Sequence, residues 1–251
     1  MLSPGEIAEV AVEVGDRKAN LPLGRMFLLG IMAGAFIALA GVGAIFGNVY
    51  GGKIAGACIF PAGLALVVIA GSELFTGNNL MVMGLFSREY GLGKLLRNWG
   101  VVFLGNLVGA LAVAWLVSLS GAFDSVTETV IATANAKVNL GFWEALIRGV
   151  LCNFLVCLAV WMSFGATSVG GKIAAVFFPV MLFVLCGFEH SVANMFYIPA
   201  GMIMGSFGGV AAPSVTGFLV GNLLPVTIGN IIGGALFVGG TYYLVYLRRK
   251  K

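Results

Sequence analysis

Long apolar stretches, separated by short polar ones, run along almost the whole chain. About 20 apolar residues are needed for one helical crossing of a bilayer core. On that length scale we expect single membrane-spanning helices at residues 26–47, 98–120, 142–164 and 217–247. Residues 54–86 and 173–208 form two further apolar stretches, too long for one crossing and too short for two crossings with a loop. The pattern therefore predicts an all-α integral membrane protein with six spans.

Polar residues interrupt both of the longer stretches near their middle. The interruptions read GSELFTGNN at residues 71–79 and GFEHSVAN at residues 187–194. Backbone that leaves a helix at membrane depth is tolerated only where protein or a water-filled cavity satisfies its hydrogen bonds. We therefore expect the second and fifth spans to be broken and the two breaks to lie on a transport pathway.

The second half of the chain repeats the first. GGKIAGACIFP at residues 51–61 recurs as GGKIAAVFFP at residues 170–179, and both breaks follow the pattern GxExxxxN. GNLVGA at residues 105–110 likewise corresponds to GNIIGG at residues 229–234, and we expect Asn106 and Asn230 within these segments to bridge helices. Each half has an odd number of expected spans, so the two copies must cross the membrane in opposite senses. The chain thus predicts an inverted 3+3 repeat with a substrate site near the membrane midplane.

These elements make up a single membrane domain over residues 1–251. The two repeats occupy residues 26–120 and 142–247, and residues 1–25 form an amphipathic segment before the first span. That segment has no apolar core followed by a cleavage site, so we expect no signal peptide. Glycine accounts for 38 of the 251 residues, often at four-residue spacing, which predicts close contacts between helices.

Composition and charge agree with a membrane location. Hydrophobic residues make up 60% of the chain and charged residues only 10%, whereas soluble domains carry about 25% charged residues. Six spans put both termini on one side, together with most of the basic residues: Arg17, Lys18, Arg25, Arg88, Lys94, Arg97, Lys172, Arg248, Arg249, Lys250 and Lys251. Lys53 and Lys137 lie on the other side, with Arg148 slightly inside the fourth span. Because basic residues concentrate in cytoplasmic loops, we expect cytoplasmic termini, and the basic loops indicate no nucleic-acid partner.

The two breaks contain the ionisable groups of greatest interest. Glu73 and Glu189 occupy equivalent positions, which favours a structural role in which they accept hydrogen bonds from backbone N–H groups freed at the breaks. His190 is the only histidine, and it has no counterpart because position 74 is Leu. Ionisable groups at membrane depth usually carry function, so we interpret His190 as a pathway residue. A histidine that merely packs in the core is the alternative.

A small monovalent anion, or its neutral acid, is the expected substrate. Half-helices that begin after Thr76 and after His190 would direct their positive dipole ends inward. The span interiors contain no acidic residue apart from those in the breaks, so a cation site is poorly supplied. Apolar constrictions that exclude hydrated ions could be formed by Phe60, Leu64, Phe75 and Phe183.

Metal and redox chemistry have little support in the sequence. The four cysteines lie inside apolar runs without a CxxC pair or a neighbouring histidine: Cys58, Cys152, Cys157 and Cys186. This pattern predicts buried free thiols. We expect neither a metal site nor a cofactor.

Four motifs resemble those of the formate/nitrite transporter family over essentially the whole chain. In order they are GSELFTGNN, LRNW followed by GNLVGA, LCNFLVCLAVWMS and GFEHSVANMF. The resemblance implies an aquaporin-like protomer of six helices with the second and fifth broken, assembled as a homopentamer in the lipid bilayer with one pore per protomer. Members of that family carry formate, nitrite or hydrosulfide. The GSELFTG break is more similar to the nitrite and hydrosulfide branches than to enterobacterial formate channels, where Asp-Leu-Phe-Thr is more common.

The resemblance also implies roles for individual residues. His190 would be the central pore histidine, faced by Thr76, with Asn153 and Asn194 as polar residues near it, and Lys137 would make the periplasmic vestibule electropositive. The outer constriction would be formed by Phe60, Leu64 and Phe183, and the inner one by Leu74, Phe75 and Val156. Desolvation in such a constriction raises the pKa of a weak acid. The anion would therefore take a proton from water or from His190 and cross as the neutral acid, by channel transport or proton symport.

Three other classes of protein fit the sequence less well. An aquaporin-like facilitator of neutral solutes shares the architecture, but the paired Asn-Pro-Ala breaks typical of it are absent. An intramembrane enzyme would need a nucleophile with a base or a metal cluster, and a single histidine without HExxH or a serine–lysine pattern argues against one. A purely structural or sensory membrane protein has no need for two broken helices.

Overall fold

The computed structural model describes residues 1–248, which are mostly helical and contain no strand. Three of the residues expected on the cytoplasmic side, Arg249, Lys250 and Lys251, lie outside the described residues. The α-helices are α1 (Pro4–Ala19), α2 (Leu23–Ile59), α3 (Pro61–Ala70), α4 (Val82–Phe86), α5 (Leu92–Leu119), α6 (Thr127–Val138), α7 (Phe142–Gly165), α8 (Val169–Cys186), α9 (Ser191–Gly208) and α10 (Leu224–Ile231). Short 3₁₀ segments are η1 (Gly77–Met81) and η2 (Asp124–Val126), and π-helical segments are η3 (Gly217–Leu223), η4 (Ile232–Gly240) and η5 (Tyr243–Leu247).

Five of the described helical stretches are long and apolar enough to cross a membrane. They are Leu23–Ala70, Leu92–Leu119, Phe142–Gly165, Val169–Cys186 and Gly217–Leu247. The first covers the first expected span and the beginning of the broken second one, and the chain turns within it at Gly52, where φ is 75° and ψ is 177°. The prediction of an all-α multi-pass membrane protein is therefore confirmed.

Both predicted interruptions are present. α3 ends at Ala70, and helical structure resumes only with η1 at Gly77. α8 ends at Cys186, and α9 begins at Ser191. In each case a glycine in the left-handed conformation, Gly71 or Gly187, follows the last helical residue. This is a common way to end a helix, because glycine adopts positive φ without strain.

Glycines bring helices into contact in both halves of the molecule, as their spacing predicts. A Cβ added at Gly34 of α2 would lie 2.1 Å from the carbonyl oxygen of Asn106 in α5. A Cβ added at Gly229 of α10 would lie 2.1 Å from the carbonyl oxygen of Leu146 in α7. No side chain larger than hydrogen fits at these crossings, so α2 packs directly on α5 and α7 packs directly on α10.

Large apolar side chains cover much of the outer surface, including Leu104, Leu116, Trp143 and Phe178. Such a surface suits lipid or neighbouring subunits rather than water. It also corrects one prediction about the cysteines. All four are free thiols, but Cys186 is exposed and Cys58 is half-buried. The apolar residues around Cys58 and Cys186 in the sequence belong to helices with an outward-facing side, so they do not indicate a buried core.

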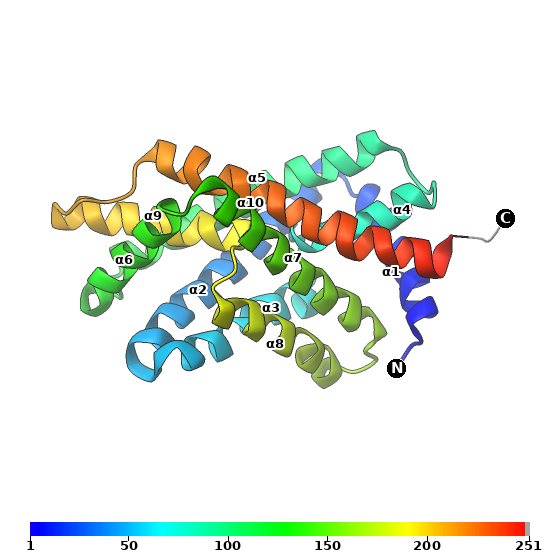
Figure 1. Ribbon diagram of the computed structural model, residues 1–251, viewed down its shortest axis with the longest axis horizontal. Coiled ribbons are helices and arrows are strands. Elements are labelled where there is room, and N and C mark those ends of the chain that lie inside the picture. Colours follow the sequence, from blue (N-terminus) through cyan, green and yellow to red (C-terminus); the bar gives the residue numbers. More distant parts are fainter. Residues whose placement is uncertain (249–251) are drawn as a thin grey trace.

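The helices form an elongated bundle (Figure 1). α1 lies at the same end as η5, which it contacts. α6 lies at the opposite end of the longest axis (Figure 1). The two breaks lie between these ends, so side chains from α1 and from α6 can approach them from opposite directions.

Candidate functional site

Two buried asparagines satisfy the backbone groups that the breaks leave without helical partners. In the first half, Asn106 Nδ2 donates to the carbonyl oxygens of Gly30 (2.7 Å) and Glu73 (2.9 Å), and its Oδ1 accepts from the Phe75 N–H (2.9 Å). Unpaired backbone groups in an apolar interior are costly. The expected helix-bridging role of Asn106 is therefore confirmed.

Asn230 makes the same three hydrogen bonds in the second half. Its Nδ2 donates to the carbonyl oxygens of Gly149 (2.8 Å) and Glu189 (2.9 Å), and its Oδ1 accepts from the Ser191 N–H (2.9 Å). Equivalent residues therefore hold the two breaks by equivalent contacts, as the sequence repeat led us to expect.

Each break also contains a buried carboxylate that is paired with a lysine. Glu73 Oε1 lies 2.9 Å from Lys18 Nζ, and Glu189 Oε1 lies 2.8 Å from Lys137 Nζ. Lys137 is only 16% exposed and lies over the ring of Tyr197, so it is part of a buried ion pair rather than a free surface charge. Removing either partner would leave an uncompensated charge, which is strongly destabilising.

Asparagines complete the two carboxylate clusters. Asn78 Nδ2 donates to Glu73 Oε2 at 2.7 Å, and Asn194 Nδ2 donates to Glu189 Oε2 at 2.6 Å. Both amides also bond a second asparagine, Asn98 or Asn222. The expectation that the carboxylates accept from freed backbone N–H groups is wrong. One freed N–H at each break, that of Phe75 or Ser191, donates to Asn106 or Asn230, and side-chain donors surround the carboxylates.

Sequence analysis missed Lys18 as a member of the site, although a signal for it was available. Positions 18 and 137 differ by 119, which is also the offset between the two GGKIA segments at residues 51 and 170. The two lysines lie outside the apolar stretches and the breaks that define the repeat, so this offset alone relates them.

Thr76 and His190 join the two breaks. Thr76 Oγ1 lies 2.9 Å from His190 Nε2, and both side chains are buried. The other ring nitrogen, Nδ1, accepts the N–H of Ala193 (3.0 Å) and so caps the start of α9. A neutral imidazole carries one N–H, and here it must be on Nε2 because Nδ1 is an acceptor. His190 therefore donates to Thr76, whose hydroxyl keeps its own proton for another acceptor.

Aromatic rings surround this pair on one side. The ring of Phe183 stacks on His190 with centroids 5.9 Å apart and an interplanar angle of 12°, and Phe60 meets Phe183 edge-on at 5.9 Å. Phe60 also stacks on Tyr197. The structure thus brings together His190, Thr76, Phe60 and Phe183, as the family resemblance implied.

The other expected constriction residues are all buried, but they have different neighbours. Phe75 packs edge-on against Trp99 and Phe103 of α5. Leu64 and Leu74 both line a cavity of about 580 Å³. Val156 lies on α7 and is 1% exposed.

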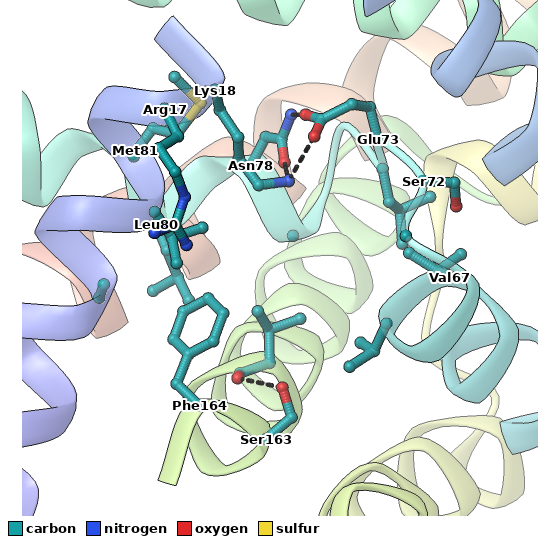
Figure 2. A pocket seen from close by; sticks show the side chains of 18 of the residues that line it. Arg17, Lys18, Val67, Ser72, Glu73, Asn78, Leu80, Met81, Ser163 and Phe164 are labelled. Atoms are coloured by element: carbon teal, nitrogen blue, oxygen red, sulfur yellow. Dashed lines mark hydrogen bonds and ion pairs between the residues drawn. The ribbon is translucent and has the colours of Figure 1, made fainter. Parts of the chain in front are cut away.

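The cavity lies beneath α1 at the first break. Figure 2 shows Glu73, Asn78 and Lys18 together at its wall, with Ser163 and Phe164 across from them. Arg17 and Lys172 add two further basic residues to the lining. Lys18 is paired with Glu73 and Arg17 with Glu13, so the net positive charge of the lining comes from Lys172, and it favours anions over cations.

α1 is held over this cavity by contacts at its C-terminal end. Arg97 donates to the carbonyl oxygen of Ala19 (2.7 Å). The Tyr90 hydroxyl, which donates to the carbonyl oxygen of Met81, lies against Gly15 of α1. Tyr90 lies in the connection between α4 and α5, where burial and the nearby charge of Asp16 raise its pKa. The hydroxyl therefore stays protonated and remains a donor. Among the described residues, no three or more His, Cys, Asp or Glu side chains are grouped so as to hold a metal ion.

Comparison with known proteins gives consistent matches over most of the chain. Residues 5–244 match the formate/nitrite transporter family. The uncharacterized transporter YrhG of Bacillus subtilis is 45% identical, over 99% of this chain and 95% of its own length. The formate channel FocA of Escherichia coli K12 is 41% identical over the same shares of the two chains.

Solved structures are similar in fold as well as in sequence. A pentameric formate channel with formate bound superposes with a TM-score of 0.80 and 36% identity, covering 90% of this chain and 98% of the other. An ion channel of the same family superposes with a TM-score of 0.84 and 31% identity, covering 96% and 98%.

Proposed function

Because the chain belongs to the formate/nitrite transporter family, we propose that it carries the anion of a small weak acid across the cytoplasmic membrane, with formate as the first candidate. Relatives named as formate channels are 38–41% identical over nearly their whole length. The GSELFTG motif instead favours nitrite or hydrosulfide, so these are the competing substrates. The observation that carries the proposal is the His190–Thr76 contact between two breaks, bordered by phenylalanine rings.

The route begins at the two lysine–carboxylate clusters, whose lysines come from α1 and α6, at opposite ends of the bundle (Figure 1). Lys18 and Lys137 raise the local anion concentration, although each is partly neutralised by its carboxylate. Beyond them the anion meets Phe60, Phe183 and other apolar side chains, where losing its hydration disfavours the charged form. The weak acid is therefore protonated before it passes the constrictions.

Water is the source of that proton in this proposal. A proton added to His190 Nδ1 would face the N–H of Ala193, which now donates to that atom. His190 consequently serves as a neutral hydrogen-bond donor, and the Thr76 hydroxyl can donate to an oxygen of the neutral acid as it passes. Both termini face the cytoplasm, and five protomers assemble with one pathway in each. The pentameric formate channel of similar fold supports that assembly.

Flux measurements with purified protein in liposomes test the proposal. Formate, nitrite and hydrosulfide should each be compared with protein-free liposomes at one pH. We expect formate uptake well above the protein-free rate. Water or glycerol permeation without transport of any of the three anions would contradict the proposal and favour a facilitator of neutral solutes.

A further inference from the structure

Several departures from the sequence repeat meet at one place. The contacts of Asn106 and Asn230 pair Phe75 with Ser191 and Gly30 with Gly149, which fixes the correspondence of the neighbouring positions. At five pairs of corresponding positions, one residue is polar or a thiol and its counterpart in the other half is apolar or glycine. The pairs are Thr76 and Val192, Asn79 and Met195, His190 and Leu74, Asn153 and Gly34, and Cys157 and Ala38. The five polar or thiol residues are buried and lie around the first break.

Two of these side chains bond the backbone of Thr76 from α7. Asn153 Nδ2 donates to the Thr76 carbonyl oxygen at 3.2 Å, and Cys157 Sγ donates to the same oxygen at 3.3 Å. The thiol is fully buried, and no other hydrogen bond from it is found within residues 1–248. A buried cysteine that only filled space would have no need to direct its S–H toward this carbonyl.

Asn79 extends the same set of contacts by one residue along the break. Its Oδ1 accepts from Asn153 Nδ2 at 3.1 Å, and its Nδ2 donates to the Phe75 carbonyl oxygen at 3.0 Å. The carbonyl groups of Phe75 and Thr76 are therefore held by three side chains that have no polar counterpart at the second break. The opposite side of Thr76, its hydroxyl, bonds His190.

A glycine makes room for these side chains. Position 234 is Gly, whereas the corresponding residue of the first half, in GNLVGA, is Ala110. A Cβ at Gly234 would lie 2.4 Å from Asn153 Nδ2, 2.7 Å from Cys157 Sγ and 2.9 Å from the Cβ of Asn79. Glycine at position 234 thus belongs with the other five differences, because it leaves room for the side chains that contact Thr76.

We propose that Asn79, Asn153 and Cys157 are positioning residues, which hold the carbonyls of Phe75 and Thr76 so that the Thr76 hydroxyl faces His190. The inference rests on the proposed function in one respect, namely that Thr76 and His190 act on the passing anion. Within the described residues one backbone hydrogen bond reaches these carbonyls, from the Asn79 N–H to the Thr76 oxygen at 3.3 Å, and the three side chains supply the other contacts that fix their orientation. Gly234 is the position that permits this arrangement.

The single histidine of the chain provides a readout that does not depend on transport. With ¹⁵N-labelled histidine, protein in lipid gives one pair of ring nitrogen resonances, both from His190. Cys157→Ala and Gly234→Ala should shift the Nε2 resonance, because each lets Thr76 move away from the ring. Cys157→Ser keeps a donor and should restore the wild-type position. Cys152→Ala, on the same helix at a buried thiol, should leave it unchanged, as should Gly100→Ala, where no atom lies within 4 Å.

Formate uptake by the same variants provides the second readout. One lost hydrogen bond of this kind corresponds to about three- to tenfold in rate, so Cys157→Ala and Gly234→Ala should each slow uptake by about that factor. Cys157→Ser and the two control variants should match wild type. In a Thr76→Val background, which has no hydroxyl to position, Cys157→Ala should cause no further loss.

The two readouts separate failure of this inference from failure of the proposed function. An unshifted Nε2 resonance in both Cys157→Ala and Gly234→Ala would overturn the positioning role, whatever is transported. An additive loss of uptake in the Thr76→Val background would overturn it as well. Shifted resonances in a protein that carries none of the tested anions would uphold the positioning of Thr76 and reject the proposed function alone.

Discussion

His190→Phe is expected to reduce formate uptake by about tenfold or more while the protein still folds and assembles. Phenylalanine has similar size and can stack on Phe183 as the imidazole does, but it cannot donate to Thr76. The variant also loses the Nδ1 cap of α9, and losing an N-cap costs about 1 kcal/mol. That cost is small beside the stability of a packed helical bundle. Uptake in proteoliposomes, with gel filtration of the same preparation, measures both effects.

His190→Asn separates capping from the contact with Thr76. Asparagine is a preferred N-cap residue and restores the acceptor for the Ala193 N–H, while its amide keeps a polar group in the pathway. We expect it to retain more uptake than His190→Phe. Undiminished uptake of every candidate anion by His190→Phe would remove His190 from the pathway. A collapsed assembly in that variant alone would favour a histidine that only packs in the core.

Lys137→Met is expected to lower stability by about 3 kcal/mol or more, because it leaves the Glu189 carboxylate without its cation. Glu189 is 3% exposed, and its other donors, Asn194 and Asn222, are neutral. Uptake should fall with stability, since Glu189 directly precedes His190. Thermal unfolding in detergent, followed by the fraction of protein that remains assembled, gives the measurement.

Two variants calibrate that result. Lys53→Met removes an exposed lysine that forms no ion pair within the described residues, and it should unfold like wild type. Adding Glu189→Gln to Lys137→Met removes the unpaired charge and should recover part of the lost stability. Equal unfolding of Lys137→Met and Lys53→Met would show that the buried pair contributes nothing to the fold.

Much of the fold could be predicted from the sequence because it depends on local patterns. The broken spans could be predicted from polar residues inside apolar stretches. The bridging role of Asn106 and Asn230 could be predicted from their equivalent places in the repeat. The pairing of Thr76 with His190 came from the family resemblance. The number of spans and the opposite orientation of the two halves remain predictions.

Other parts of the site depend on contacts between elements that are distant in the chain. Lys18 reaches Glu73 only because α1 folds back over the first break, and apart from the repeat offset that relates Lys18 to Lys137, no local pattern indicates that contact. Cys157 looks like an ordinary apolar residue of α7 until the Thr76 carbonyl is placed beside it. The exposure of Cys186 was wrongly predicted for a related reason, since an apolar run does not distinguish a core-facing helix side from an outer one.

The dependence of uptake on pH, compared between formate and chloride, shows whether the transported molecule crosses as a neutral acid. Formate belongs to a weak acid and can be neutralised in the constriction, whereas chloride belongs to a strong acid and cannot. With the wild-type protein in liposomes, we predict that formate uptake accelerates as the external pH is lowered and that chloride passes poorly at every pH. Chloride transport equal to that of formate, with no dependence on pH, would show that fixed dipoles and lysines alone carry the ion and would contradict the account.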